Sequence, residues 1–212
     1  MDKPSSVRSG RPPLTERRKA ETRLEIAREA VRLFAEKGVS ATTAEEIAAA
    51  AGISLRTLWR YTASKENCVL PLLTTGIDAM AHSLRTWRTE QGVDGLLDDM
   101  QRDSGRLISH LSAQLDLVRL TRTEPSLRTV WTQAHADAEP VFAEVLADRL
   151  GTSADDLSTR LHAAMINVAL RVAVEHHAFH ETPTTAEAVF ATVREALTPA
   201  VRCLEEALPR ST

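Results

Sequence analysis

A short run of cationic, hydroxyl and aromatic side chains in the first third of the chain has the chemistry for contact with a nucleic-acid duplex. Arg56 can place its guanidinium fork on guanine O6 and N7, and Thr57 can bond a phosphate or touch a thymine methyl group. Arg60 carries a charge that attracts phosphate, while the rings of Trp59 and Tyr61 can pack on sugars and donate hydrogen bonds to phosphates. The alternative is that both rings belong to the hydrophobic core and that the arginines form a solvated face.

Two residues at predicted helix starts extend this set. Thr43 and Lys65 each lie where backbone N–H groups without helical partners favour a phosphate, and Lys65 adds a positive charge. The residues that we predict to contact DNA are Thr43, Ser54, Leu55, Arg56, Thr57, Trp59, Arg60, Tyr61 and Lys65.

The spacing of small and apolar residues indicates which elements position that run. Ala48 allows two helices to approach closely, Gly52 suits a backbone conformation that costs other residues energy, and Leu58 can fill the angle between the helices. Thr43 and Glu46 form a T-x-x-E capping box at the start of the first helix. This pattern is typical of a helix-turn-helix, whose second helix lies in the major groove while the first crosses the DNA backbone.

A longer set of residues surrounds the helix-turn-helix in a fixed order. It consists of Ile26-Ala27, Ala30, Phe34, Gly38, Thr43, Ile47-Ala48, Ala51-Gly52-Ile53-Ser54, Thr57-Leu58, Arg60-Tyr61 and Ser64-Lys65-Glu66. With these residues, the segment from about Ile26 to Leu70 resembles the tetracycline-repressor (TetR) family. The resemblance implies an all-helical dimeric repressor, with three helices for DNA and further helices for ligand and dimer contacts. Arg56, Trp59 and Thr62 depart from the family, which often has Gly, Tyr and Phe at these positions.

Composition and charge agree with an all-α chain of two unlike parts. Of the 212 residues, 43% are hydrophobic and only 4% are aromatic, a mix that favours helix over strand. Residues 1–70 hold 13 Lys and Arg against 9 Asp and Glu, whereas residues 71–212 hold 13 against 20. A basic first third joined to an acidic remainder favours a polyanionic partner for the first part, unless the difference is a chance fluctuation in surface charge.

We predict three parts along the chain. Residues 1–14 form a disordered basic arm, residues 15–64 the helix-turn-helix DNA-binding domain, and residues 65–212 a larger helical ligand-binding and dimerisation domain. Within the arm, Ser9-Gly10-Arg11-Pro12 resembles part of an A·T hook, which threads an arginine into the minor groove. The alternative is an irregular soluble tail.

The larger part is predicted to be helical throughout. Because proline interrupts the helical hydrogen bonds, Pro140 and Pro199 are expected to kink or split their helices. The predicted helices run over residues 65–90, 93–121, 125–150, 153–180 and 185–208.

Two apolar stripes near the end of the chain predict a dimer interface. Two such helices from each subunit can form a four-helix bundle, which spaces two recognition helices about 34 Å apart for a palindromic operator. The alternative is that both stripes pack inside one subunit. The predicted interface residues are Leu161, Met165, Val168, Val172, Phe190, Val193, Leu197 and Leu204.

Large rings and one polar stripe are the candidates for a small-molecule site. Asn167, Arg171 and Glu175 recur every four residues on an apolar helix, where burial costs energy unless the groups are paired or hold a ligand. An Arg171–Glu175 pair at the dimer seam is the structural alternative. The candidate contacts for a small hydrophobic or amphipathic effector are Trp87, His110, Trp131, Phe142, Asn167 and Arg171.

Other chemistry is not indicated. His176, His177 and His180 have partial metal-ligand spacing, but solvated histidines near a helix end are the favoured interpretation, so we expect no metal and no cofactor. The sequence contains no nucleophile motif and no phosphate-binding glycine loop, so we do not predict an enzyme. Cys68 and Cys203 form no disulfide framework, and we expect a cytoplasmic chain with no signal peptide and no membrane span.

Together these patterns predict a DNA-binding transcriptional regulator. We expect a homodimeric repressor that binds a palindromic operator and is released by a small molecule, which must bind two states of the dimer unequally to shift their populations. The alternatives are a DNA-binding or protein-interaction module without a ligand, and an all-helical enzyme.

Overall fold

The protein is described here by a computed structural model that covers residues 14–88, 91–102, 105–180 and 184–207. Every regular element in these ranges is a helix, which confirms the predicted all-α class. Residues 1–13 of the predicted arm, with the hook-like segment at residues 9–12, lie outside the described residues, and the last residue of the arm, Leu14, begins α1.

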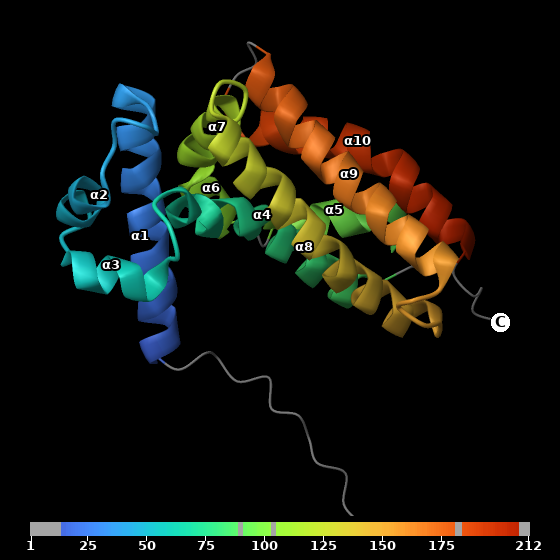
Figure 1. The fold of residues 1–212 in the computed structure, drawn as a ribbon. Helices are drawn as coiled ribbons and strands as arrows, with labels where there is room; N and C mark the ends of the chain where they lie inside the picture. Colours follow the sequence, from blue (N-terminus) through green and yellow to red (C-terminus); the bar gives the residue numbers. More distant parts are fainter. Residues whose placement is uncertain (1–13, 89–90, 103–104, 181–183, 208–212) are drawn as a thin grey trace, which may run out of the picture.

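Three helices form the N-terminal head: α1 (Leu14–Lys37), α2 (Ala44–Ala50) and α3 (Leu55–Tyr61). One face of α1 is buried over its second half, because apolar residues recur there at helical spacing; Ile26 and Phe34 are 2% and 1% exposed. In Figure 1 the short helices α2 and α3 lie against one side of α1, with α3 at the outer edge of the molecule.

The segment after the head begins with a short 3-10 helix, η1 (Glu66–Val69), and continues as α4 (Leu70–Thr86). The predicted helix over residues 65–90 is therefore shorter than expected and has a distinct first turn. Pro71 lies in the first turn of α4, where its missing N–H has no helical partner to lose. Figure 1 shows α4 leading from the head into the body.

The single helix predicted over residues 93–121 is wrong, because a break lies at His110, and the stretch contains three described helical segments. They are α5 (Gly92–Arg102), α6 (Gly105–Ser109) and α7 (Leu111–Leu120). His110, between α6 and α7, has a ψ of 7°, outside the helical region. The apolar periodicity of the sequence continues across His110 and does not reveal this break.

Three long helices complete the body: α8 (Pro125–Leu150), α9 (Leu157–Phe179) and α10 (Ala186–Ala207). They run side by side in Figure 1. Pro140 and Pro199 were expected to kink or split their helices; neither helix is split, since α8 contains Pro140 and α10 contains Pro199 without interruption. Burial of their apolar faces offsets the cost of a lost helical hydrogen bond, about 3 kcal/mol.

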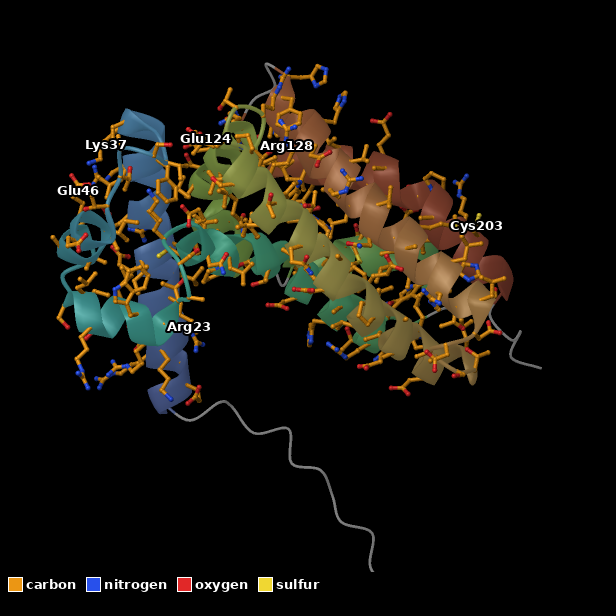
Figure 2. All side chains as sticks on the ribbon, in the orientation of Figure 1. Arg23, Lys37, Glu46, Glu124, Arg128 and Cys203 are labelled. Atoms are coloured by element: carbon orange, nitrogen blue, oxygen red, sulfur yellow. The ribbon has the colours of Figure 1, made fainter. Side chains whose placement is uncertain are left out.

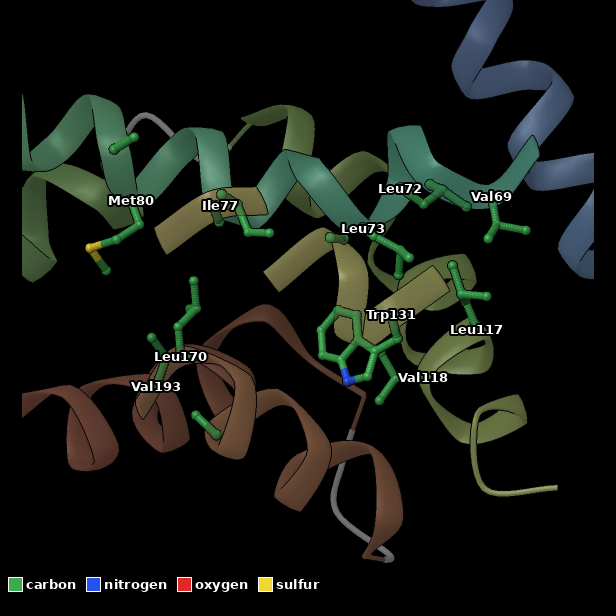
Figure 3. Packing of buried hydrophobic residues seen from close by; sticks show 14 of the residues in the cluster. Val69, Leu72, Leu73, Ile77, Met80, Leu117, Val118, Trp131, Leu170 and Val193 are labelled. Carbon is green, nitrogen blue, oxygen red and sulfur yellow. The ribbon is translucent and has the colours of Figure 1, made fainter. Parts of the chain in front are cut away.

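One continuous hydrophobic core joins the head to the body. It contains Phe34 and Leu58 from the head, Leu72 and Met80 from α4, and Trp131 from α8. Figure 3 shows the Trp131 ring below Leu73 and Ile77 of α4, with Val118 of α7 beside it. Movement of α4 relative to the body therefore has a direct packing route to the head.

Candidate functional site

The short helix α3 is anchored on one face and open on the other. Leu58 is fully buried, at 0% exposed, and holds α3 on α2 and α1. Arg56 and Arg60 are exposed, and Trp59 is 46% exposed, which is a large apolar area for a side chain with no packing role. Trp59 therefore does not belong to the core, in contrast to the alternative interpretation of the sequence.

Local hydrogen bonds set the start of α3. The Ser54 hydroxyl accepts a hydrogen bond from the Thr57 backbone N–H at 3.2 Å, and the two hydroxyl oxygens lie 2.9 Å apart. The turn before Ser54 depends on Gly52, whose φ of +66° is in the left-handed region that glycine adopts without a steric penalty. The sequence thus fixes the angle between α2 and α3 at residues 52–54.

The start of α2 carries the predicted capping box. The Thr43 hydroxyl accepts from the Glu46 N–H at 3.3 Å, and the Glu46 carboxylate accepts from the Thr43 N–H at 2.8 Å. Glu46 also pairs with Lys37 at the end of α1 (Figure 2). Thr43 is exposed, but its hydroxyl and its own N–H both serve the cap, so its part in DNA contact remains a prediction.

Tyr61, at the end of α3, lies between two arginines. The Arg60 guanidinium carbon is 5.3 Å from the centre of the Tyr61 ring, and that of Arg23 from α1 is 5.7 Å away. These cation–π contacts hold a half-buried ring between two cations. Figure 2 places Arg23 on α1 beside this end of α3. The sequence analysis did not select Arg23, because it lies 38 residues before Tyr61 and no local spacing joins them.

The structure does not support two of the predicted DNA contacts. The Lys65 ammonium donates to the backbone carbonyls of Val39 at 2.7 Å and Thr42 at 2.9 Å, so it holds the loop between α1 and α2. Leu55 is half-buried and packs against the core. Leu55 begins the recognition helix and Lys65 follows it in sequence, but tertiary contacts that the sequence does not reveal turn both inward.

One face of α9 exposes an apolar stripe. Leu161 is 57% exposed, Val168 48% and Val172 47%, and Met165 is half-buried among them. A shallow groove of about 550 Å³ runs along this stripe between α9 and α10. A soluble protein rarely leaves a contiguous apolar surface of this kind uncovered, so the stripe has the character of an interface.

The four α10 residues predicted for the same interface are buried within the subunit, and this prediction is wrong. Phe190, Val193, Leu197 and Leu204 are between 0% and 7% exposed. They lie on the inner face of α10, where they pack into the core of the body. A heptad stripe looks the same whether it faces a partner or the subunit's own core. The α10 residues that border the α9 groove are instead Ala196, Pro199 and Ala200.

The body contains a small apolar cavity between α4, α7, α8, α9 and α10, with a volume of about 60 Å³. Trp131 and His135 line it from α8, and their rings meet edge to face with centres 4.2 Å apart. The Trp131 Nε1 donates to Glu175 on α9 at 2.7 Å, and Arg171 donates to both oxygens of Glu175 at 3.0 Å. The structure therefore brings Trp131 and Arg171 together through Glu175, as a paired group beside the cavity.

Three of the predicted ligand contacts lie elsewhere and are corrected. Trp87 is 2% exposed and its Nε1 donates to the Gly92 carbonyl at 2.9 Å, away from the cavity. Phe142 is fully buried in the core. His110 lines a separate hollow against α1, beside Arg28. The size of a ring in the sequence does not distinguish a core position from a cavity wall.

His135 is the residue that the sequence analysis missed. It lies four positions after Trp131 on the same helix face, a spacing that could have identified it. Its Nδ1 is 2.7 Å from Asn167 Oδ1, so Asn167 acts through His135 and does not itself line the cavity. Burial lowers the pKa of His135 below the ordinary histidine value, which keeps the ring neutral.

A larger hollow of about 750 Å³ lies at the junction of head and body, between α1, the end of α3 and α4. Arg23 and Tyr61 line one side, and Asp78 and His82 of α4 line the other. Burial raises the pKa of Asp78. Because its walls belong to the head and to α4, the shape of this hollow changes with the angle between them.

The histidine group near the end of α9 does not form a metal site in the described part of the chain. The His176 and His180 rings stack with centres 4.1 Å apart, and the His180 Nδ1–H donates to the His176 carbonyl at 2.7 Å. Among the described residues, no cluster of three or more His, Cys, Asp or Glu side chains is placed to hold a metal ion. Likewise, no helix in the described ranges is long and apolar enough to cross a membrane.

Two family models match the chain in sequence. The model described as "Bacterial regulatory proteins, tetR family" matches residues 26–72, and that described as "MftR C-terminal domain" matches residues 108–209. The first contains the helix-turn-helix and η1, and the second contains α7 to α10 together with part of α6.

Curated relatives are named as transcriptional regulators and not as enzymes. The chain is 29% identical to the HTH-type transcriptional repressor AcnR of Corynebacterium efficiens over an alignment of 134 residues. This alignment covers 63% of this chain and 66% of that repressor. It is 28% identical to the HTH-type transcriptional regulator TcmR of Streptomyces glaucescens over an alignment of 152 residues. That alignment covers 68% of this chain and 67% of the regulator. The matches thus span about two thirds of each relative.

Solved structures align over most of the chain. The flavonoid-responsive regulator FrrA is 25% identical, with 92% of this chain and 99% of that chain covered and a TM-score of 0.48. FadR of Thermus thermophilus, a TetR-family repressor solved in complex with lauroyl-CoA, is 24% identical, with 90% and 97% covered and a TM-score of 0.47.

Proposed function

Because this chain belongs to the TetR family of bacterial regulatory proteins, we propose that it is a homodimeric repressor that binds a palindromic operator and is released by a small molecule. The observation that carries the proposal is the open face of α3. Arg56, Trp59 and Arg60 are exposed together on a helix that Leu58 anchors from behind. Such a helix can enter the major groove without any rearrangement of the head.

The charges on α3 support this contact. Neither Arg56 nor Arg60 forms an ion pair with another residue in the described ranges, whereas Lys37 pairs with Glu46 and Arg17 pairs with Glu21. A cation that has no carboxylate partner can approach a phosphate without first breaking an ion pair. Each phosphate contact then releases condensed counterions, which favours binding at low salt.

The exposed stripe on α9 supports the dimer. Leu161, Val168 and Val172 are each about half exposed and lie on one helix face, next to the groove that Pro199 of α10 borders. Two copies of this surface can cover one another about a two-fold axis, since the same residues then meet on both sides. The two-fold axis would relate two α3 helices, as a palindromic operator requires.

The effector part of the proposal rests on the cavity in the body and its route to the head. The cavity is lined by Leu72, Leu73 and Ile77 of α4, and α4 continues directly from η1 beside the head. A ligand that binds better when α4 is displaced shifts the dimer toward states whose α3 helices no longer fit the operator. We therefore propose the division into a DNA-binding head, residues 15–64, and a ligand-binding and dimerisation body, residues 65–212. Such a regulator works in the cytoplasm, where the DNA is.

Selection of bound duplexes from a random pool, with the full chain, tests the proposal. We expect the enriched sequence to be a palindrome whose half-site centres are about one helical turn, or a multiple of it, apart. The variant Trp59→Ala should enrich the same palindrome poorly, because the exposed ring adds contact but no fold stability. Enrichment of no sequence, or of an asymmetric site by a single protomer, would overturn the proposal.

A further inference from the structure

The body cavity has one unsatisfied polar atom in an apolar wall. The described side chains around it are mainly aliphatic or aromatic, and its polar members are Gln114 and His135. The Gln114 amide nitrogen already donates to the Leu72 carbonyl at 2.9 Å. His135 is 4% exposed, and its Nε2 is buried without a hydrogen-bond partner. A buried polar atom without a partner costs about 1–3 kcal/mol, so its retention calls for an explanation.

Two hydrogen bonds determine which ring nitrogen of His135 carries the proton. The Asn167 amide nitrogen donates to the His135 backbone carbonyl at 2.8 Å, which turns the Asn167 oxygen toward the ring. That oxygen can only accept, so His135 Nδ1, 2.7 Å away, must donate. In the neutral ring, Nε2 therefore carries a lone pair and no hydrogen, and it can only accept.

The ring has little freedom to turn away from this arrangement. Trp131 meets it edge to face at an interplanar angle of 85°, and the Trp131 Nε1 is itself fixed by Glu175 at 2.7 Å. Figure 3 shows the Trp131 nitrogen directed away from α4, toward the α9 and α10 ribbons. Nε2 is thus an acceptor of fixed direction, and because almost none of its surface is open, a donor reaches it only when the cavity widens.

We propose that this cavity binds a neutral, mainly apolar molecule through one hydroxyl or N–H group, which donates a hydrogen bond to His135 Nε2. The inference deepens the proposed function, since it names the chemical class of effector for the same body. Asn167 is the positioning residue that selects a donor over an acceptor. The cavity, at about 60 Å³, is several times the roughly 10–15 Å³ that one water molecule needs but smaller than the about 150 Å³ of a cavity that holds benzene, so a ring enters as α4 moves outward.

The surroundings argue against a charged ligand. Arg171, a cation whose charge acts on His135, is paired with Glu175 through two hydrogen bonds of 3.0 Å and does not line the cavity. An anion in the cavity would therefore meet no unpaired cation there, and a cation would lie among aliphatic walls. Burial also keeps the ring neutral, because it lowers the pKa of His135. A neutral ligand is the class that loses least on leaving water.

Phenol and toluene are matched probes, since they share a ring and differ only in a hydroxyl or a methyl group. Their dissociation constants for the full chain can be measured by calorimetry in the absence of DNA. In a purely apolar cavity toluene binds better, because phenol must leave its hydrogen bonds to water. With Nε2 as acceptor, we expect phenol to bind about tenfold better than toluene. In His135→Phe the order should reverse, and in His162→Phe, which replaces another buried histidine outside the cavity, it should not.

The ring nitrogens can also be observed without any variant. In ¹⁵N-labelled wild-type protein, NMR should show His135 Nδ1 with a proton and Nε2 without one, and phenol should shift the Nε2 resonance. Toluene bound as well as phenol, no binding of either probe, or a protonated Nε2 would each overturn the inference. Operator binding is measured separately from binding of these probes. The inference about the cavity can therefore fail while the proposed function stands.

Discussion

The carboxylate of Glu124, at the start of α8, accepts a hydrogen bond from the backbone N–H of Val39 in the head, with Oε1 3.4 Å from the nitrogen. The carbonyl of the same Val39 accepts from Lys65 at 2.7 Å, just before η1. Val39, in the loop between α1 and α2, is therefore held by Glu124 at the start of α8 and by Lys65 just before η1. Figure 2 shows Glu124 at the junction of α7 and α8, facing the head.

Removal of this carboxylate should loosen the loop. In Glu124→Ala the Val39 N–H loses its partner, and we expect its hydrogen exchange to accelerate about threefold to tenfold, as a hydrogen bond of about 0.5–1.5 kcal/mol implies. Glu144→Ala, an exposed glutamate of the same helix, is the control and should leave this amide unchanged. Equal exchange in both variants would show that Glu124 does not hold the head.

Lys65 is expected to act on stability and not on DNA. In Lys65→Met two backbone carbonyls lose a charged donor, so the free energy of unfolding should fall by about 1–3 kcal/mol. Each kcal/mol lost should lower Tm by about 2–4 °C. Lys19→Met breaks only the exposed pair with Glu16 and should cost less than about 1 kcal/mol. Thermal unfolding measures both. If Lys65→Met retains wild-type Tm but reduces the salt dependence of operator binding, Lys65 contacts phosphate instead.

The α9 stripe should control assembly. Val168→Asp places a charge in the centre of the proposed interface, where burial of an unpaired carboxylate opposes association. We expect the mass from light scattering to fall from that of a dimer to that of a monomer. Ile108→Asp is a matched control, because Ile108 and Val168 have the same 48% exposure and Ile108 lies on α6. A dimeric Val168→Asp protein would place the interface elsewhere.

Acid should destabilise the protein through two histidines whose pKa values the fold lowers. Burial lowers the pKa of His135, and burial together with Arg28 lowers the pKa of His110. The unfolded chain therefore takes up these protons at a higher pH than the folded chain does. The free energy of unfolding should be level well above the ordinary histidine pKa of about 6.5 and should fall as pH drops below it.

The variant His135→Gln isolates one contribution to this pH dependence. Urea unfolding between about pH 7.5 and about pH 5.5 should give a shallower loss of stability than in the wild type, with the remainder due to other groups. His82→Gln replaces an exposed histidine and should retain the wild-type slope. An unchanged slope in His135→Gln would mean that this ring is not held neutral by the fold.

Features with local causes could be predicted from the sequence. The capping box of Thr43 and Glu46, the Ser54 cap and the turn at Gly52 each depend on residues within a few positions of one another, and all are present in the structure. Their spacing determines the helix-turn-helix, and the exposed face of α3 follows from it. The all-α class follows from composition and helical periodicity in the same way.

Features that depend on distant residues could not be predicted. The apolar stripe with Val193 and Leu197 gave the correct helix but not the direction in which it faces, because core and interface have the same periodicity. The contacts of Lys65 with the loop at Val39 join segments 26 residues apart. The spacing of His135 from Trp131 places both on one helix face, but its hydrogen bond to Asn167, 32 residues away on α9, cannot be read from the sequence.

The exposed face of α3 should be the surface that binds DNA. The most direct test is the affinity of the double variant Arg56→Ala/Arg60→Ala for the selected palindrome. Fluorescence anisotropy at several salt concentrations should show binding at least about tenfold weaker than wild type. The salt slope should be smaller by up to about 2, because each arginine that neutralises a phosphate adds about one to it. Arg85→Ala/Arg88→Ala removes two exposed arginines of the body and should bind as the wild type does. If the α3 variant is folded and dimeric but binds the palindrome with wild-type affinity and salt dependence, α3 is not the DNA-binding surface.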